Sequence, residues 1–234
     1  MKRDVLSGLR RDIAAKRPVV LATRLATGED CLLHPFDPSP GGDAALVALA
    51  REAADRDESR TVETADGEVF LRVFNPPVRL VIVGAVHVAQ ALSPMARLAG
   101  YDVVVVDPRR SFATSARFQD VAVTTEWPDE AMARIGVDRR SAVVTMTHDP
   151  KIDDPALVAA LRSKAFYVGA LGSKKTQAAR RERLREQGFS EADVARIHGP
   201  VGFSIGAVSP GEIAVSILAQ LVACLRRPGE PGPA

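Results

Sequence analysis

The stretch Arg79-Leu80-Val81-Ile82-Val83-Gly84-Ala85-Val86-His87-Val88-Ala89 decides the fold of this chain. After the leading arginine it is a continuous apolar run, which is expected of a strand covered on both faces. Gly84 then permits a tight bend, and a helical apolar pattern continues to Leu98. A buried strand that passes through a glycine turn into a helix is typical of a nucleotide-binding βαβ unit.

The same alternation continues toward the C-terminus. The pattern predicts further strands at 102–106, 121–123, 141–146 and 165–168, and helices at 155–164, 174–187 and 210–226. Strands that alternate with helices form right-handed βαβ units around a parallel sheet. We therefore predict the α/β class, with a Rossmann-type parallel sheet from about Val78 onward.

The first 75 residues show a different pattern. They predict a helix at 4–16, a strand at 19–24, a proline-rich loop at 34–43, a helix at 44–54 and a strand at 69–74. The pair Pro76-Pro77 continues neither a helix nor a strand, so it marks a domain boundary. We expect a small α+β domain at 1–75, a Rossmann-like domain at 78–227 and a disordered Pro/Gly-rich tail at 228–234.

Composition excludes several classes of protein. Lys and Arg total 31 against 29 Asp and Glu, which gives no basic surplus typical of nucleic-acid binding. Cys31 and Cys224 lie far apart in no ligand spacing, as in a reduced cytoplasmic protein. The sequence contains no apolar run long enough for a membrane span. We predict a cytoplasmic protein that binds no nucleic acid and has no membrane span.

The glycine turn departs from the usual dinucleotide fingerprint. Gly84 and Ala89 fit its first and third small positions, but Val86 replaces the middle glycine that lets a pyrophosphate approach. Asp107 follows the second strand, where an acid that binds the ribose of NAD is expected. The alternative is that Gly84 only turns the chain and Asp107 only caps the next loop.

Polar residues follow several strands, and the ends of parallel strands meet at one edge of a sheet. The candidate ligand-binding residues at this edge are Gly84, His87, Asp107, Arg109, His148, Asp149, Gly172, Ser173, Lys174 and His198. Their basic and histidine side chains suit an anionic, phosphate-bearing ligand. The alternatives are a Ser173 helix cap, structural histidines, and a solvated face at Lys174, Lys175, Arg180, Arg181 and Arg183. The histidines lack the local spacing of a metal site, and the chain has no motif of nucleophilic catalysis, so we predict neither.

Five motifs in order resemble the C-terminal domain of the XdhC/CoxI family, the accessory proteins of xanthine dehydrogenase. They are LVIVGAVHVAQAL, VVVVDPRRSFAT, THDPKIDDPAL, FYVGALGSKKT and IHGPVGFSIGAVSPGEIAVSILAQL, and together they cover about 78–226. The resemblance implies a Rossmann domain preceded by a smaller domain. It also implies a non-catalytic chaperone that binds the molybdenum cofactor, as molybdopterin or its dinucleotide form, and inserts it into a molybdenum hydroxylase. Self-association into a homodimer is a further implication.

Three positions depart from the family pattern. Val86 stands where the family has glycine, Phe203-Ser204 replaces a Leu-Asp pair, and residues 1–75 lack the family's Gly-Gly-Cys motif. Two other functions therefore stay open: an NAD(P)-dependent oxidoreductase, and a degenerate Rossmann binding module. The last predicted helix is apolar around much of its circumference, which fits either deep burial or a dimer interface.

Overall fold

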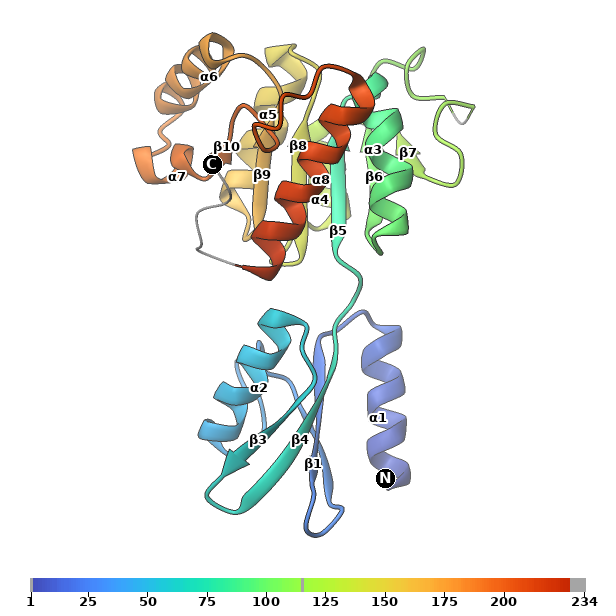
Figure 1. Ribbon diagram of the computed structural model, residues 1–234, viewed down its shortest axis with the longest axis vertical. Helices are drawn as coiled ribbons and strands as arrows, with labels where there is room; N and C mark the ends of the chain where they lie inside the picture. The colour runs from blue at the N-terminus through green and yellow to red at the C-terminus, as the bar shows by residue number, and fades with distance from the viewer. Residues whose placement is uncertain (1, 115, 228–234) are drawn as a thin grey trace. The chain divides into compact units, whose positions relative to one another are not determined.

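The computed structural model describes residues 2–114 and 116–227 (Figure 1). The chain divides at Pro76–Pro77 into two compact units, Met1–Pro76 and Pro77–Ala234, here called the N-terminal and C-terminal units. The tail predicted to be disordered, 228–234, lies outside the described residues. Among those residues, no helix combines the length and apolar character that a membrane crossing requires.

The N-terminal unit is a four-stranded antiparallel sheet with two helices, which confirms the α+β prediction. The strands lie in the order β2-β1-β4-β3. Its elements are α1 (Arg3–Ala14), β1 (Val19–Arg24), β2 (Asp30–Leu33), α2 (Ala44–Arg56), β3 (Arg60–Thr64) and β4 (Gly67–Phe74). Asp43 caps α2, whose alanines pack with Val20 and Leu71 in the core of this unit.

The sequence pattern does not predict the strands β2 and β3. Both lie at the edges of the sheet, and each buries a single residue, Leu33 in β2 and Val62 in β3. An edge strand with one buried position shows little apolar alternation, so its periodicity is weak.

The C-terminal unit is built on six parallel strands in the order β10-β9-β8-β5-β6-β7, which confirms the Rossmann-type α/β fold. Its strands are β5 (Arg79–Val83), β6 (Asp102–Val106), β7 (Ala122–Thr124), β8 (Ser141–Thr145), β9 (Tyr167–Ala170) and β10 (Ile197–His198). Its helices are α3 (His87–Leu98), α4 (Pro128–Ile135), α5 (Pro150–Arg162), α6 (Lys174–Glu186), α7 (Glu191–Ala195) and α8 (Pro210–Arg226).

Helices cover both faces of this sheet. Leu80 and Ile82 point to the face covered by α3 and α8, whereas Val81 and Val83 point to the face covered by α4 and α5 (Figure 1). Burial on both sides explains why β5 appears in the sequence as a continuous apolar run and why every residue of β8 is buried.

Helix α5 begins earlier in the chain than the sequence predicts. The sequence predicts a helix from Pro155, but α5 begins at Pro150, which occupies the first helical turn behind the capping residue Asp149. Proline is well tolerated at that first position, and Pro155 then costs the helix one internal hydrogen bond without ending it.

The order of the strands reverses at β5, which pairs with β6 on one side and β8 on the other. From β5 the chain proceeds outward to β6 and β7, and it then returns to build β8, β9 and β10 on the opposite side. Ligands of open α/β sheets bind beyond the carboxyl ends of the strands at such a switch point. A ligand is therefore expected at the turns that follow β5 and β8.

Candidate functional site

The turn after β5 packs tightly against its neighbours at the switch point. Gly84 N–H donates to the Val106 carbonyl at 2.8 Å, and Met146 N–H donates to the Val83 carbonyl at 2.8 Å. Gly84 has φ +114°, and a Cβ atom there would lie 2.6 Å from Thr147 Cγ2. Glycine is thus required both by the backbone conformation and by the loop after β8.

The helix that leaves this turn begins without a capping side chain. Val86 is the N-cap of α3, and no described side chain accepts from its first turn. Asp149, Ser173 and Ser209 cap α5, α6 and α8, which begin at the same edge of the sheet, whereas α4, like α3, has no capping side chain. The first N–H groups of α3 and the positive end of its dipole are therefore available to an anion.

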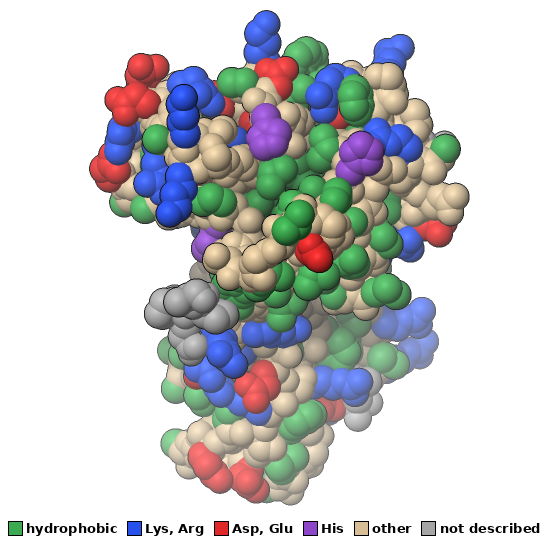
Figure 2. All heavy atoms as spheres, turned by 45° about the horizontal axis from the view of Figure 1, so that its top comes forward, with side chains coloured by type: hydrophobic (Ala, Val, Ile, Leu, Met, Phe, Trp, Pro, Cys, Tyr) green, Lys and Arg blue, Asp and Glu red, His purple; other side chains and the backbone are tan. Residues whose placement is uncertain are grey.

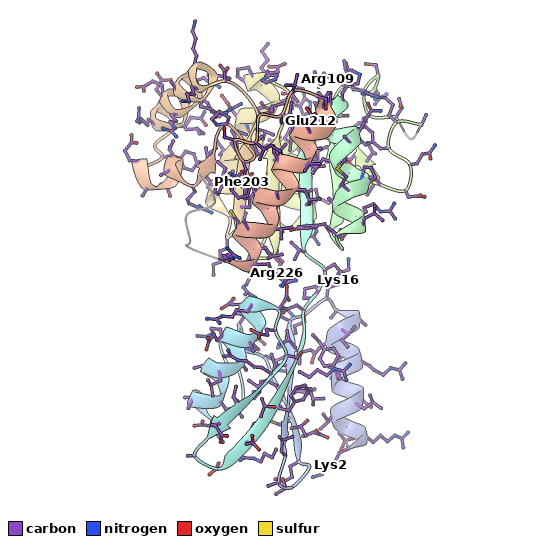
Figure 3. The ribbon with its side chains drawn as sticks, in the orientation of Figure 1. Lys2, Lys16, Arg109, Phe203, Glu212 and Arg226 are labelled. Atoms are coloured by element: carbon purple, nitrogen blue, oxygen red, sulfur yellow. The ribbon has the colours of Figure 1, made fainter. Side chains whose placement is uncertain are left out.

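Asp107, at the end of β6, holds this turn in place. It is fully buried (0% exposed), and its Oδ2 accepts from Ala85 N–H at 2.8 Å. Arg109 donates from its backbone N–H, Nε and Nη2 to the same carboxylate at 2.8–3.0 Å. The Arg109 guanidinium also lies over the Phe112 ring, 4.5 Å from its centre. Both carboxylate oxygens of Asp107 thus bind protein donors, and the residue positions Arg109 at the carboxyl edge (Figure 3).

Replacement of Asp107 by asparagine is expected to destabilise the C-terminal unit by about 1–3 kcal/mol at neutral pH. Burial opposes ionisation, but the hydrogen bonds from Arg109 and Ala85 outweigh it and lower the pKa of Asp107 below its ordinary value. Its stabilisation is therefore present above the unfolded pKa of about 3.9 and is lost as pH falls through the folded value. Urea unfolding of both proteins between about pH 3 and neutral should show the gap closing in acid; a gap independent of pH would contradict this role.

The loop after β8 is wrapped around a buried carboxylate. Asp153, in the first turn of α5, accepts from Thr147 Oγ1 at 2.7 Å and from the backbone N–H groups of Thr147 and His148 at 3.2 Å. His148 lies in the left-handed region at φ +65°, which a non-glycine residue adopts at a cost of roughly 1 kcal/mol. Its side chain is exposed, as is that of His87 across the switch point.

Asp153 belongs to a buried network that links two strand ends. It accepts from Arg180 Nη2 at 3.3 Å, and Arg180 Nη1 donates to Gln177 Oε1 at 2.6 Å. Gln177 Nε2 donates to the Ala170 carbonyl at the end of β9. Burial raises the pKa of Asp153 and lowers that of Arg180, so each group depends on the other for its charged form. This network fixes the loops after β8 and β9 relative to each other.

The turn after β9 starts α6. Gly172 precedes Ser173, which caps α6 by accepting from Thr176 N–H at 3.2 Å. This contact is the helix cap that the sequence analysis gives as the alternative to ligand binding. Lys174 is exposed and lines a hollow of about 520 Å³ with Arg181, Gly199 and Pro200. Along the edge, the Lys174 ammonium group therefore lies beyond His148, one strand farther from the switch point at β5.

The His198 side chain lies away from the other two histidines of this edge. Its ring stacks on Tyr167, at 4.6 Å between ring centres, and its Nε2 lies 3.9 Å from Cys224 Sγ. Burial lowers its pKa. The sequence places His198 in a glycine-rich stretch among the ligand-binding residues, whereas the structure places it in the short strand β10. Its ring lies against Tyr167 and against Cys224 of α8, and it does not join His87 and His148.

The carboxyl edge, defined here as residues 84–87, 107–109, 147–149 and 172–174, therefore brings together most of the predicted residues. Along the sheet the order is Lys174, His148, His87 and Arg109, because β9, β8, β5 and β6 are neighbours. Figure 2 shows histidine, basic and hydrophobic side chains together on this end of the C-terminal unit. Among the described residues, no group of three or more His, Cys, Asp or Glu side chains is placed to hold a metal ion.

Sequence reasoning missed the residues that support this edge, Asp153, Gln177 and Arg180. A signal existed: Gln177, Arg180 and Leu184 share one face of α6 at helical spacing, and all three are buried. The basic run around Arg180 instead suggested a solvated face, which is wrong for Arg180 and holds for the exposed Lys174, Lys175 and Arg181.

Comparison with known proteins decides the family. Residues 80–221, more than half of the chain, match the XdhC Rossmann domain. The chain belongs to the XdhC family. This match covers the switch point and the carboxyl ends of all six strands of the C-terminal unit.

Two curated relatives come from Escherichia coli K12. The molybdenum cofactor insertion chaperone PaoD is 34% identical over 148 residues, 63% of this chain and 40% of PaoD. The uncharacterized protein YqeB is 32% identical over 154 residues, 66% of this chain and 28% of YqeB.

A third relative, a probable xanthine dehydrogenase subunit from Bacillus subtilis, is 29% identical over 160 residues, 68% of this chain and 46% of that protein. The chain thus spans less than half the length of these curated relatives. A solved structure of a xanthine dehydrogenase from Bacillus halodurans superposes with a TM-score of 0.69 at 26% identity, covering 99% of this chain and 66% of that one.

Proposed function

We propose that this chain binds the molybdenum cofactor at the carboxyl edge and delivers it to a molybdenum hydroxylase such as xanthine or carbon monoxide dehydrogenase. One observation carries the proposal: in an XdhC Rossmann domain, the exposed histidines His87 and His148 flank a switch point whose helix α3 has no capping side chain. The name of PaoD, a molybdenum cofactor insertion chaperone, supports the same function.

The chemistry of the edge suits this cargo. The cofactor is a pterin that carries a phosphate, extended in some forms by a nucleotide. The N–H groups at the start of α3 and the guanidinium of Arg109 would bind the phosphate. His87 and His148 would donate hydrogen bonds to the pterin or to the oxo groups of the metal. From β9 to β6 the edge spans about 14 Å at the usual strand spacing, which is long enough for the extended dinucleotide form, with Lys174 at one end and Arg109 at the other.

The oxidoreductase alternative is less well supported. An NAD-binding site needs a carboxylate that accepts from the ribose hydroxyls, and both oxygens of Asp107 are already engaged by Ala85 and Arg109. Val86 adds a side chain where a pyrophosphate needs backbone alone. Both features argue against NAD in its usual pose.

Anaerobic isothermal titration of the purified chain tests the proposal, with molybdopterin, molybdopterin cytosine dinucleotide, NAD and NADP as separate ligands. We expect micromolar affinity for at least one cofactor form. His148→Ala or Lys174→Ala should weaken it about tenfold, since each removes a hydrogen-bonding or charged contact. Lys164→Ala is the matched control, because Lys164 is exposed between α5 and β9, at the opposite ends of the strands.

The remaining outcomes separate the alternatives. Binding of NAD or NADP, with no binding of either cofactor form, would favour an oxidoreductase over a chaperone. Failure of all four ligands to bind would leave the degenerate binding module, a fold retained for protein contacts.

A further inference from the structure

Two large aromatic side chains are exposed beside the carboxyl edge. Phe112, in the loop after β6, is 40% exposed, and Trp127, the residue before α4, is 50% exposed. Every other phenylalanine and tyrosine in the described part of the chain is buried or partly buried. An aromatic ring left in water forgoes the burial that stabilises it elsewhere, so two such rings at one end of a sheet mark a binding surface.

The strands β6 and β7 bring the two rings to the same part of the sheet. These strands pair in parallel, and at their carboxyl ends Asp107 N–H donates to the Thr124 carbonyl at 3.0 Å. Phe112 follows Asp107 by five residues, and Trp127 follows Thr124 by three. The loop after β6 and the start of α4 therefore flank the ends of the same two strands.

Two guanidinium groups lie over the Phe112 ring. Arg109 is 4.5 Å and Arg117 is 5.8 Å from the ring centre. Arg117 is itself fixed, because its Nη2 donates to Gln90 Oε1 of α3 and its Nη1 donates to the Phe112 carbonyl, both at 3.0 Å. The loop thus offers aromatic surface together with positive charge. Nucleobases stack on aromatic rings and on guanidinium planes, and the phosphate of a nucleotide binds such charges.

We propose that Phe112 and Trp127 form a base subsite, which binds the nucleobase of the dinucleotide form and makes this chain prefer that form to molybdopterin. The proposal rests on the proposed function, that the carboxyl edge binds the molybdenum cofactor. With the phosphates at the start of α3 and at Arg109, the base lies over the ends of β6 and β7. The pterin then extends the other way along the sheet, toward His148 and Lys174.

The dimensions of the sheet fit this arrangement. Helix α3 follows β5, and β7 is two strands from β5, about 10 Å at the usual spacing. A nucleotide extends over a comparable distance from its phosphate to its base. The usual ribose contact is missing here, since the two oxygens of Asp107 bind Ala85 and Arg109. Stacking of the base is therefore what holds the nucleoside half.

Fluorescence of Trp127 reports this subsite alone, because the chain has one tryptophan. Stacking of a base on an indole ring quenches its emission. We expect CMP, the nucleotide part of molybdopterin cytosine dinucleotide, to quench the emission of the full chain to saturation, and the dinucleotide to do so anaerobically. Ribose 5-phosphate and molybdopterin are the matched controls. Each carries a phosphate but no nucleobase, so neither should quench the emission after correction for absorbance.

Two substitutions of Trp127 separate stacking from bulk. In isothermal titration we expect the unaltered chain to bind the dinucleotide at least about fivefold more tightly than molybdopterin, the lower end of what one base–aromatic stack contributes. Trp127→Leu should remove most of this preference and leave the affinity for molybdopterin unchanged, which also shows that the variant folds. Trp127→Phe should retain the preference, because a phenyl ring still stacks. Leu98→Ala is the control: Leu98 is 90% exposed but ends α3, at the opposite ends of the strands.

The outcomes distinguish failure of the base subsite from failure of the proposed function. Equal affinity for the two cofactor forms, with Trp127 emission unchanged when the dinucleotide saturates the chain, would overturn the base subsite and leave the proposed function intact. Binding of neither form would overturn both. Quenching by AMP or NAD, with none by CMP or the dinucleotide, would assign the subsite to NAD and overturn the proposal. A Trp127→Leu protein that keeps the full preference for the dinucleotide would overturn it as well.

Discussion

Replacement of Arg180 by methionine is expected to lower the free energy of unfolding by about 3–5 kcal/mol, among the largest effects of any single substitution in the C-terminal unit. Arg180 is 2% exposed and pairs with Asp153, which is equally buried. Without its partner, the Asp153 carboxylate would remain buried with its charge uncompensated. Methionine fills a similar volume, so the loss of stability measures the missing charge and hydrogen bonds of Arg180 rather than the effect of a cavity.

Arg181→Met is the matched control. Arg181 is the next residue of the same helix, but its side chain is exposed, so its loss should change stability by less than about 1 kcal/mol. Urea unfolding of the two variants beside the unaltered chain makes the comparison. Equal effects of the two substitutions would show that Arg180 does not hold the buried network together.

The pH dependence of the Arg180→Met defect provides a second test. Burial already raises the pKa of Asp153 in the unaltered chain, and loss of Arg180 should raise it further. A carboxyl whose folded pKa exceeds its unfolded value of about 3.9 destabilises the folded state increasingly as pH rises between the two values. The Arg180→Met defect should therefore be smaller near pH 4 than at neutral pH.

Replacement of Gly84 by alanine is the second substitution for which we expect a large effect, about 3 kcal/mol or more. The left-handed conformation alone costs an L-residue about 1–2 kcal/mol. The added Cβ would also lie 2.6 Å from Thr147 Cγ2 and 3.2 Å from the Thr147 backbone nitrogen, so β5 and β8 would have to separate at the switch point. We therefore expect cofactor affinity to fall together with stability.

Gly100→Ala separates these two causes. Gly100 has φ +88°, but a Cβ atom there would meet nothing within 4 Å, so only the backbone strain of about 1–2 kcal/mol should appear. Thermal and urea unfolding of both variants measure the difference. A Gly84→Ala protein no less stable than Gly100→Ala would show that the contact with Thr147 is unimportant.

The sequence predicts the strands that are buried on both faces and the helices that begin at a capping side chain. β5 and β8 are recognisable because both faces are covered, and α6 and α8 because serines cap them. β2 and β3 are not, because an edge strand buries little.

The sequence predicts which strand ends form the candidate site, but it does not predict which side chains contact one another there. The position of Asp107 suggests a ribose-binding acid or a cap of the next loop, and its carboxylate does bind Arg109, two residues later. Its other partner, Ala85, is brought within reach only by the folded turn. Arg180 belongs to a charged run, and its burial depends on Asp153, 27 residues earlier in the chain. The orientation of the His198 ring likewise depends on Tyr167 and α8, which local sequence does not reveal.

The central claim, that the carboxyl edge binds the molybdenum cofactor, is tested most directly by amide chemical-shift mapping. The ¹⁵N-labelled chain would be titrated anaerobically with molybdopterin and its cytosine dinucleotide. We predict that the largest shifts fall on residues 84–89 and 147–149, with Lys174 added when the dinucleotide binds. Shifts confined to the N-terminal unit or to α8, with residues 84–89 unchanged at saturation, would contradict the account.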